Sequence, residues 1–115
     1  MHKLLPFLFF SLSALASAQN PAPAALPHAR ADLEPFLQTY CIKCHGPKRQ
    51  KGQVRFDQLN WEITNNDNAQ RWQDVLDQLH GGDMPPEDAK LPSDDELANV
   101  LESLTGAVVE ARRRL

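Results

Sequence analysis

The stretch C-I-K-C-H at residues 41–45 constrains this chain most strongly. Two thiols three positions apart, followed at once by an imidazole, form the pattern at which haem is attached covalently to a protein. The thiols of Cys41 and Cys44 can add to the two vinyl groups of haem, and the imidazole of His45 can then reach the iron from one face. The sequence therefore predicts a chain that folds around one covalently bound haem c.

Two other interpretations of this cysteine pair have to be compared with haem attachment. A thioredoxin-like redox pair is expected beside a βαβ pattern, and no alternating, strand-rich segment lies near residues 41–45. A zinc site could use Cys41 and Cys44 with His45 or His80, but a second compact ligand pair is missing from the sequence. We therefore favour haem over thiol or zinc chemistry.

The first 18 residues have the pattern of a secretory signal peptide. A short basic start precedes an apolar run over residues 4–15, and A-S-A at 16–18 supplies a cleavage site before Gln19. The apolar run is shorter than the about 20 residues that a membrane span needs, so we expect cleavage and no stable span. We expect the mature protein to be periplasmic or otherwise exported, in keeping with haem attachment outside the cytoplasm.

The mature chain is predicted to hold a short leader and one domain. Residues 19–30 are rich in Pro and Ala without an apolar period, which indicates a flexible leader, and residues 31–115 are long enough for one small domain. Within that domain a helix capped by Asp32, with Pro35 in its first turn, should run up to the cysteine motif.

Two further helices follow from the apolar spacing. One covers residues 68–79 and should stop at the double glycine 81–82, and the other starts with a capping box, S-D-D-E at 93–96, and continues to Val108. Val54 and Phe56 alternate with polar residues, but no convincing partner strand is present. The fold class is therefore all-α, a small domain of about three main helices around a haem.

The ligand on the second face of the iron separates an electron carrier from a haem catalyst or gas binder. Met84 is the leading candidate, because it lies in G-G-D-M-P-P at 81–86 and not on an apolar helical face, where methionine usually fills a core. His80 is the rival ligand, although a histidine at a helix end can simply interact with the helix dipole. His28 lies in the leader and is a weaker candidate.

Other side chains can be assigned to the surroundings of the haem. His45 should donate its second ring N–H to a backbone carbonyl, for which the loop around Pro47 is the nearest source. Four residues are candidates for contacts with the haem propionates. These are Arg55, Arg71, Trp61 and Trp72. For each tryptophan, packing within the protein is at least as good an explanation.

The charge of the chain limits its partners. The formal net charge is -3, and cleavage of the signal peptide makes the chain more negative because it removes Lys3. Nucleic acid is therefore not an expected partner. We expect redox partner proteins with a basic docking patch, although a modest net charge is also usual for a soluble domain.

The order of these motifs resembles class I cytochromes c and, within them, the planctomycete-type cytochrome c domain. The resemblance extends from about residue 33 to 104 through CIKCHGPKRQKG at 41–52, RWQDVLDQL at 71–79 and GDMPPE at 82–87. It implies a cytochrome c-like fold in which Cys41, Cys44, His45 and Met84 hold the haem. Such domains often stand at the N-terminus of much longer secreted proteins, so the chain is either a free-standing carrier or a truncated relative of these.

Three functions are compatible with the sequence. The leading hypothesis is an exported carrier of single electrons with His/Met axial ligation, and not an enzyme. The second is a haem enzyme or a gas or redox sensor whose sixth iron position is open or weakly held, which would bind carbon monoxide readily. The third is a haem-bearing interaction module of a larger complex, which would co-purify with its partner.

Overall fold

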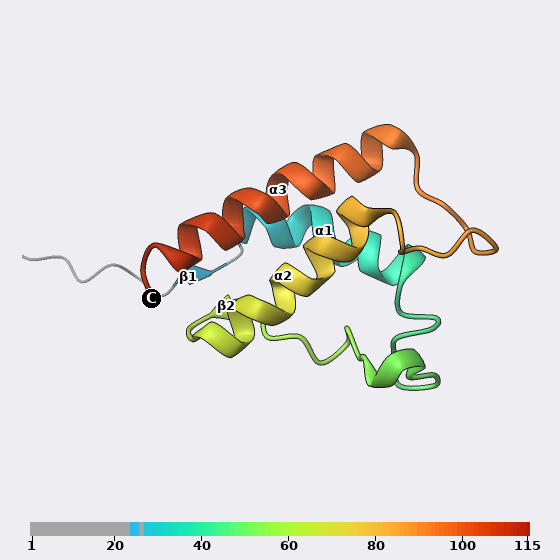
Figure 1. Cartoon of the computed structure of the whole chain (residues 1–115), viewed down its shortest axis with the longest axis horizontal. Helices are drawn as coiled ribbons and strands as arrows, with labels where there is room; N and C mark the ends of the chain where they lie inside the picture. Colours follow the sequence, from blue (N-terminus) through green and yellow to red (C-terminus); the bar gives the residue numbers. More distant parts are fainter. Residues whose placement is uncertain (1–23, 26) are drawn as a thin grey trace, which may run out of the picture.

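The computed structural model describes residues 24–25 and 27–115, with side chains from residue 29 onward. The expected signal peptide, residues 1–18, lies outside the described residues. The elements follow in the order β1 (Ala24–Ala25), α1 (Pro27–Tyr40), a short 3-10 turn (Lys51–Gln53), β2 (Glu62–Ile63), α2 (Asn66–Gly81) and α3 (Asp94–Arg112). This arrangement confirms the predicted small all-α domain. Figure 1 shows α3 along one side of the molecule, where it packs on both α1 and α2.

Helix α1 begins at Pro27, before the helix cap that was expected at Asp32. Proline suits the first helical position, because its fixed φ matches the helix and its missing N–H would have no partner there. Ala29 is buried in the core, so the helix extends back to include it. Asp32 is consequently not the cap of this helix. It lies inside α1, where its carboxylate accepts a hydrogen bond of 2.5 Å from the hydroxyl of Ser103 in α3.

The strands β1 and β2 form a two-stranded antiparallel ribbon, although no strand pairing was expected in either segment. Ala24 pairs with Ile63, and Ala25 pairs with Glu62. Part of the segment 19–30 thus forms regular structure, since residues 24–25 are in β1 and residues 27–30 are in α1. The ribbon places the buried side chain of Ile63 against the core.

The ends of α2 and α3 follow the chemistry that the sequence indicates. The side chain of Asn65 accepts a hydrogen bond of 2.8 Å from the backbone N–H of Asn68 and so caps α2. Gly82 ends this helix in the left-handed conformation with φ 72°. The predicted capping box of Ser93 and Glu96 is confirmed at the start of α3. Within the described residues, no helix combines the length and the apolar character that a membrane crossing requires.

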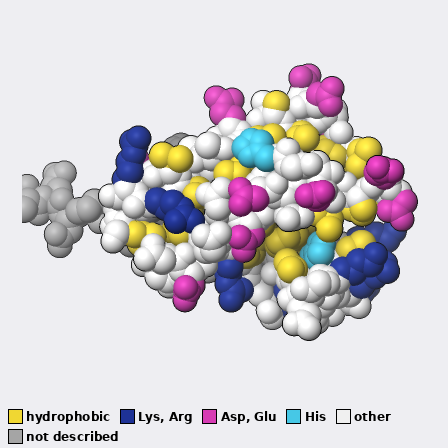
Figure 2. Space-filling view, in the orientation of Figure 1, with side chains coloured by type: hydrophobic (Ala, Val, Ile, Leu, Met, Phe, Trp, Pro, Cys, Tyr) yellow, Lys and Arg dark blue, Asp and Glu magenta, His cyan; other side chains and the backbone are white. Residues whose placement is uncertain are grey.

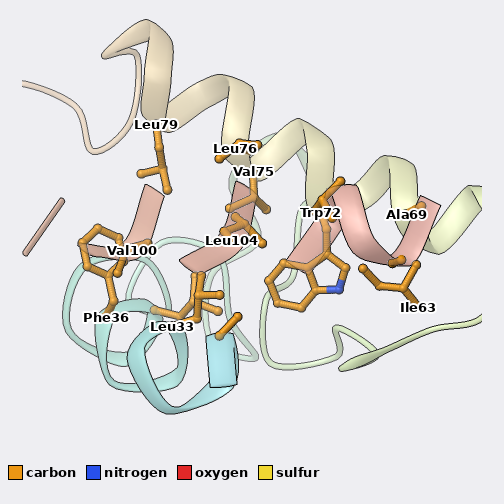
Figure 3. Close-up of a cluster of buried hydrophobic side chains, with 14 residues drawn as sticks. Leu33, Phe36, Ile63, Ala69, Trp72, Val75, Leu76, Leu79, Val100 and Leu104 are labelled. Carbon is orange, nitrogen blue, oxygen red and sulfur yellow. The ribbon is translucent and has the colours of Figure 1, made fainter. Parts of the chain in front are cut away.

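One apolar core joins the three helices. Figure 3 shows side chains of α2 pointing toward α1 and α3, with Trp72 beside Ile63 and Ala69. Trp72 is fully buried, its ring lies 5.0 Å from that of Trp61, and its Nε1–H donates a 2.9 Å hydrogen bond to the carbonyl of Asn60. Both tryptophans therefore serve the packing of the protein, which was the alternative to propionate contacts.

Candidate haem site

The two cysteines and the histidine of the motif come from one turn of backbone at the end of α1. The N–H of Cys41 donates to the carbonyl of Leu37 at 2.9 Å, which continues the helix past its last residue. The N–H groups of Cys44 and His45 then donate to the carbonyl of Cys41 at 3.1 and 2.9 Å. Both cysteines are half-buried free thiols. The motif is thus presented on a rigid turn that α1 anchors in the core.

A cavity of about 590 Å³ lies beside this turn, within the range of roughly 300–1,000 Å³ that is usual for ligand sites. Its apolar wall includes Leu37 from α1, Val75 and Leu79 from α2, and Phe56 and Leu59 from the segment between the helices. Four residues that the sequence predicted as haem-binding also line it. These are Cys41, Cys44, His45 and Met84. The donor set and the apolar wall together fit a haem c.

The imidazole of His45 is held by a backbone carbonyl. Its Nδ1 lies 3.0 Å from the carbonyl oxygen of Lys51. In the tautomer with the proton on Nδ1, this nitrogen donates to Lys51 and Nε2 keeps a free lone pair for a metal. The loop after His45 folds back to make this contact, because the N–H of Lys51 donates to the carbonyl of Cys44 at 2.9 Å. The acceptor is therefore Lys51, a few residues beyond the expected position around Pro47.

The turn that supplies this carbonyl contains strained backbone. Gly52 and Gln53 both have positive φ angles, of 62° and 60°. Glycine adopts this conformation at little cost, whereas a residue with a side chain loses about 1–2 kcal/mol. The Lys51 carbonyl accepts from His45 and also from the N–H of Val54 at 3.2 Å. The strained residue Gln53 thus lies in the same turn as the Lys51 carbonyl, which orients the imidazole of His45.

Gly46, the residue after the motif, has no room for a side chain. A Cβ there would lie 2.4 Å from the carbonyl oxygen of Ile42 and 2.9 Å from its Cγ2. We expect Gly46→Ala to lower the free energy of unfolding of the holoprotein by about 1–3 kcal/mol, because the turn of the motif must shift. Urea unfolding followed by circular dichroism measures this change.

Gly106→Ala is the matched control for this substitution. A Cβ at Gly106 meets nothing within 4 Å, and Gly106 lies inside α3. We expect this variant to be more stable than the parent by roughly 0.5–1 kcal/mol, because alanine favours the helix. Equal stability of the Gly46→Ala protein and the parent would show that the turn tolerates a side chain.

Met84 reaches the same cavity from the loop that follows α2. The N–H groups of Asp83 and Met84 donate to the carbonyl of Gln78 at 3.2 and 3.3 Å, so the loop turns sharply after Gly82. The Met84 side chain is 39% exposed and lines the cavity together with both prolines that follow it. Met84 is therefore neither a core residue nor part of an apolar helix face, so packing does not explain its position.

His80, the rival of Met84, is not at the cavity. His80 is exposed in the last turn of α2 and is not among the residues that line the cavity. The backbone of His28 lies in α1, and its side chain is outside the described part of the structure. The arrangement therefore favours Met84 over His80 as the partner of His45.

The surroundings of the two cysteines can be compared with what a thioredoxin-like redox pair or a zinc site would need. Burial, and secondarily the neighbouring Cys44, raises the pKa of Cys41 to about 12. Thiol–disulfide exchange needs a thiolate, so Cys41 is poorly suited to a thioredoxin-like role. In the described part of the chain, no three His, Cys, Asp or Glu side chains come together as a metal site would require. Neither observation favours thiol or zinc chemistry.

Two of the four propionate candidates line the cavity. Arg71 and Arg55 contribute to its wall, and Arg55 is paired with Asp57 through a hydrogen bond of 3.0 Å between Nε and Oδ1. Trp61 and Trp72 do not line it. Sequence reasoning did not assign Tyr40 to the site, yet Tyr40 also lines the cavity. Its position directly before Cys41 was the signal that could have identified it.

Comparison with known families agrees with this geometry. The region of residues 41–88 matches the family model described as planctomycete cytochrome C. Comparisons with curated proteins and with solved structures gave no significant match. The family match spans both cysteines, His45 and Met84, and it implies haem c as the cofactor. Residues 41–88 of the chain therefore match the planctomycete cytochrome C family, and this match indicates a haem-binding protein.

Proposed function

We propose that the protein is an exported electron carrier, with haem c bound through Cys41 and Cys44 and held between His45 and Met84. One observation supports this most directly. The two thiols, the imidazole and the thioether all line one cavity, and Nδ1 of the imidazole is engaged by the carbonyl of Lys51. The haem iron, when bound, would supply the ferric and ferrous states between which one electron is exchanged.

Each part of the chain has a separate task in this proposal. The Lys51 carbonyl orients His45 so that Nε2 is the ligand, and it makes the imidazole a stronger donor. The thioether of Met84 favours ferrous iron and raises the reduction potential. The apolar wall of the cavity limits access of water. A haem iron held by both His45 and Met84 would have no position left for a substrate, which favours a carrier over an enzyme.

The visible spectrum of the mature protein tests this proposal. The protein is produced by export in a cell with haem-attachment machinery and is measured oxidised and reduced, with and without carbon monoxide. We expect covalent haem, sharp reduced bands, a sulfur-to-iron band in the oxidised protein and no change with carbon monoxide. A high-spin spectrum that responds to carbon monoxide would instead favour a haem enzyme or a sensor with an open sixth position.

We also propose that the redox partner docks through a basic patch. Three exposed carboxylates lie in the loop that carries Met84. These are Asp83, Glu87 and Asp88. On the other side of the cavity, the segment 43–51 carries four exposed cations, and none of them takes part in an ion pair among the described residues. Figure 2 shows Lys and Arg side chains gathered at this end of the molecule, with Asp and Glu nearby. A basic patch would be attracted to the loop and repelled by the segment, which fixes its orientation.

Charge reversal on the two sides tests this docking mode with small oxidants of opposite charge. We expect Glu87→Lys with Asp88→Lys to slow oxidation of the ferrous protein by cationic tris(phenanthroline)cobalt(III) about tenfold at low ionic strength. Lys48→Glu with Arg49→Glu should accelerate the same reaction. Stopped-flow rates measured with ferricyanide, an anion, should change in the opposite directions. A parent protein that prefers ferricyanide at low ionic strength would assign an acidic patch to the partner.

A further inference from the structure

Tyr40 stands between the haem cavity and a second, smaller cavity. It is the last residue of α1 and directly precedes Cys41. Besides lining the main cavity, it lines one of about 200 Å³ between α1 and α3, together with Asp32 and Glu96. Its side chain is half-buried. Tyr40 is thus placed to connect the segment that attaches the haem with the residues of α3 that line the smaller cavity.

The contacts of Tyr40 lead to the chain that follows Met84. Its hydroxyl donates to the carboxylate of Glu96, with distances of 3.0 and 3.1 Å to the two oxygens. The same carboxylate accepts a 2.9 Å hydrogen bond from the backbone N–H of Ser93, as part of the capping box. Nζ of Lys90 lies 5.5 Å from the centre of the Tyr40 ring, within the range of a cation–π contact.

These contacts hold the far end of the loop that carries Met84. Its near end is fixed to α2, where the N–H of Met84 donates to the carbonyl of Gln78. In the middle, the N–H of Ala89 donates to the carbonyl of Pro86, which is a bond within the loop itself. At the far end, Lys90 and the start of α3 both meet Tyr40. The loop is therefore tied to α2 at one end and to the haem-attachment helix at the other.

We propose that Tyr40 is a positioning residue that keeps the Met84 loop against the haem cavity, so that the thioether stays on the iron. The inference rests on the proposed function, because it assigns a task to the ligand Met84. Tyr40 acts through Lys90 and Glu96 and does not itself ligate. Loss of its hydroxyl should increase the fraction of molecules in which the loop has moved away and the sixth position is open.

The test compares Tyr40→Phe with Ser103→Ala in the full-length holoprotein. Tyr40→Phe keeps the ring and its contact with Lys90 but removes the hydrogen bond to Glu96. Ser103→Ala removes another hydroxyl–carboxylate bond between α3 and α1, the one to Asp32, which does not involve the loop. Both variants lose one interhelical hydrogen bond of the same kind. A difference between them therefore reports on the loop.

Two measurements follow the position of the loop. The first is the rate of carbon monoxide binding to the ferrous protein, together with the sulfur-to-iron band of the ferric protein. The second is tryptic cleavage after Lys90, which reports on departure of the loop without using the spectrum of the haem. We expect both rates to rise at least about threefold in Tyr40→Phe, and the band to weaken, with parent values in Ser103→Ala.

The outcomes separate this inference from the proposed function. Equal rates in Tyr40→Phe and Ser103→Ala, in both measurements, would show that Tyr40 has no special effect on the loop. A parent protein without a sulfur-to-iron band would contradict His/Met ligation and with it the assigned task. Faster cleavage after Lys90 in Tyr40→Phe would in that case still show that Tyr40 holds the loop.

Discussion

Replacement of Met84 with alanine should lower the reduction potential on the order of 0.1 V or more and should allow the ferrous protein to bind carbon monoxide. The thioether favours ferrous iron, and with Cys41 and Cys44 used for haem attachment, no other soft donor among the residues that line the cavity could replace it. The side chain is already 39% exposed, so its removal costs little core packing. A spectroelectrochemical titration of the parent and the variant measures the change.

Leu91→Ala is the control for the Met84 substitution. Leu91 lies in the same segment between α2 and α3, is 55% exposed and does not line the cavity. Its loss should leave the potential and the spectrum unchanged. If Met84→Ala behaves in the same way as this control, Met84 is not the ligand, and His80→Ala becomes the next variant to examine.

Replacement of Trp72 with alanine should lower the free energy of unfolding by about 3–5 kcal/mol. The indole projects from α2 and is fully buried in the core, and its Nε1–H donates to the carbonyl of Asn60. A loss of this size is a large part of the about 5–15 kcal/mol that usually holds a small domain together. Urea unfolding of the holoprotein measures it, with Trp72→Phe as a milder variant that keeps most of the volume.

Trp61→Ala provides the comparison for the Trp72 variants. Trp61 packs on Trp72 and lies 5.1 Å from the guanidinium of Arg30, but it is only half-buried. Its removal should cost clearly less stability than the removal of Trp72. Because neither tryptophan lines the cavity, every variant that stays folded should keep the parent spectrum. A spectrum altered in Trp72→Phe would mean that this side chain influences the haem directly.

The sequence allowed those features to be predicted that depend on residues close together in the chain. The capping box of Ser93 and Glu96 and the glycine stop at Gly82 are confirmed, because each is a local contact of three or four residues. The cysteine motif identified the family for the same reason, since the thiols and the imidazole share one turn of backbone. Three amphipathic segments were then sufficient to predict an all-α domain.

Other features depend on backbone atoms or on contacts between distant segments. The acceptor for His45 is the carbonyl of Lys51, which every residue type possesses and which a sequence pattern therefore does not reveal. The pairing of Ala24 with Ile63 and the start of α1 at Pro27 depend on packing against parts of the chain that come much later. The contact between Tyr40 and Glu96 spans 56 positions.

The short ribbon of β1 and β2 has a consequence for how the domain can be attached to something else. Figure 1 shows β1 and the C-terminus together at one end of the molecule, and β1 packs on α3. The loops that contribute Cys41, His45 and Met84 to the cavity lie at the opposite end. A surface, an electrode or a fused protein joined at Leu115 would therefore sit away from the cavity mouth. The domain can be immobilised at this end while the opposite end stays open to exchange electrons.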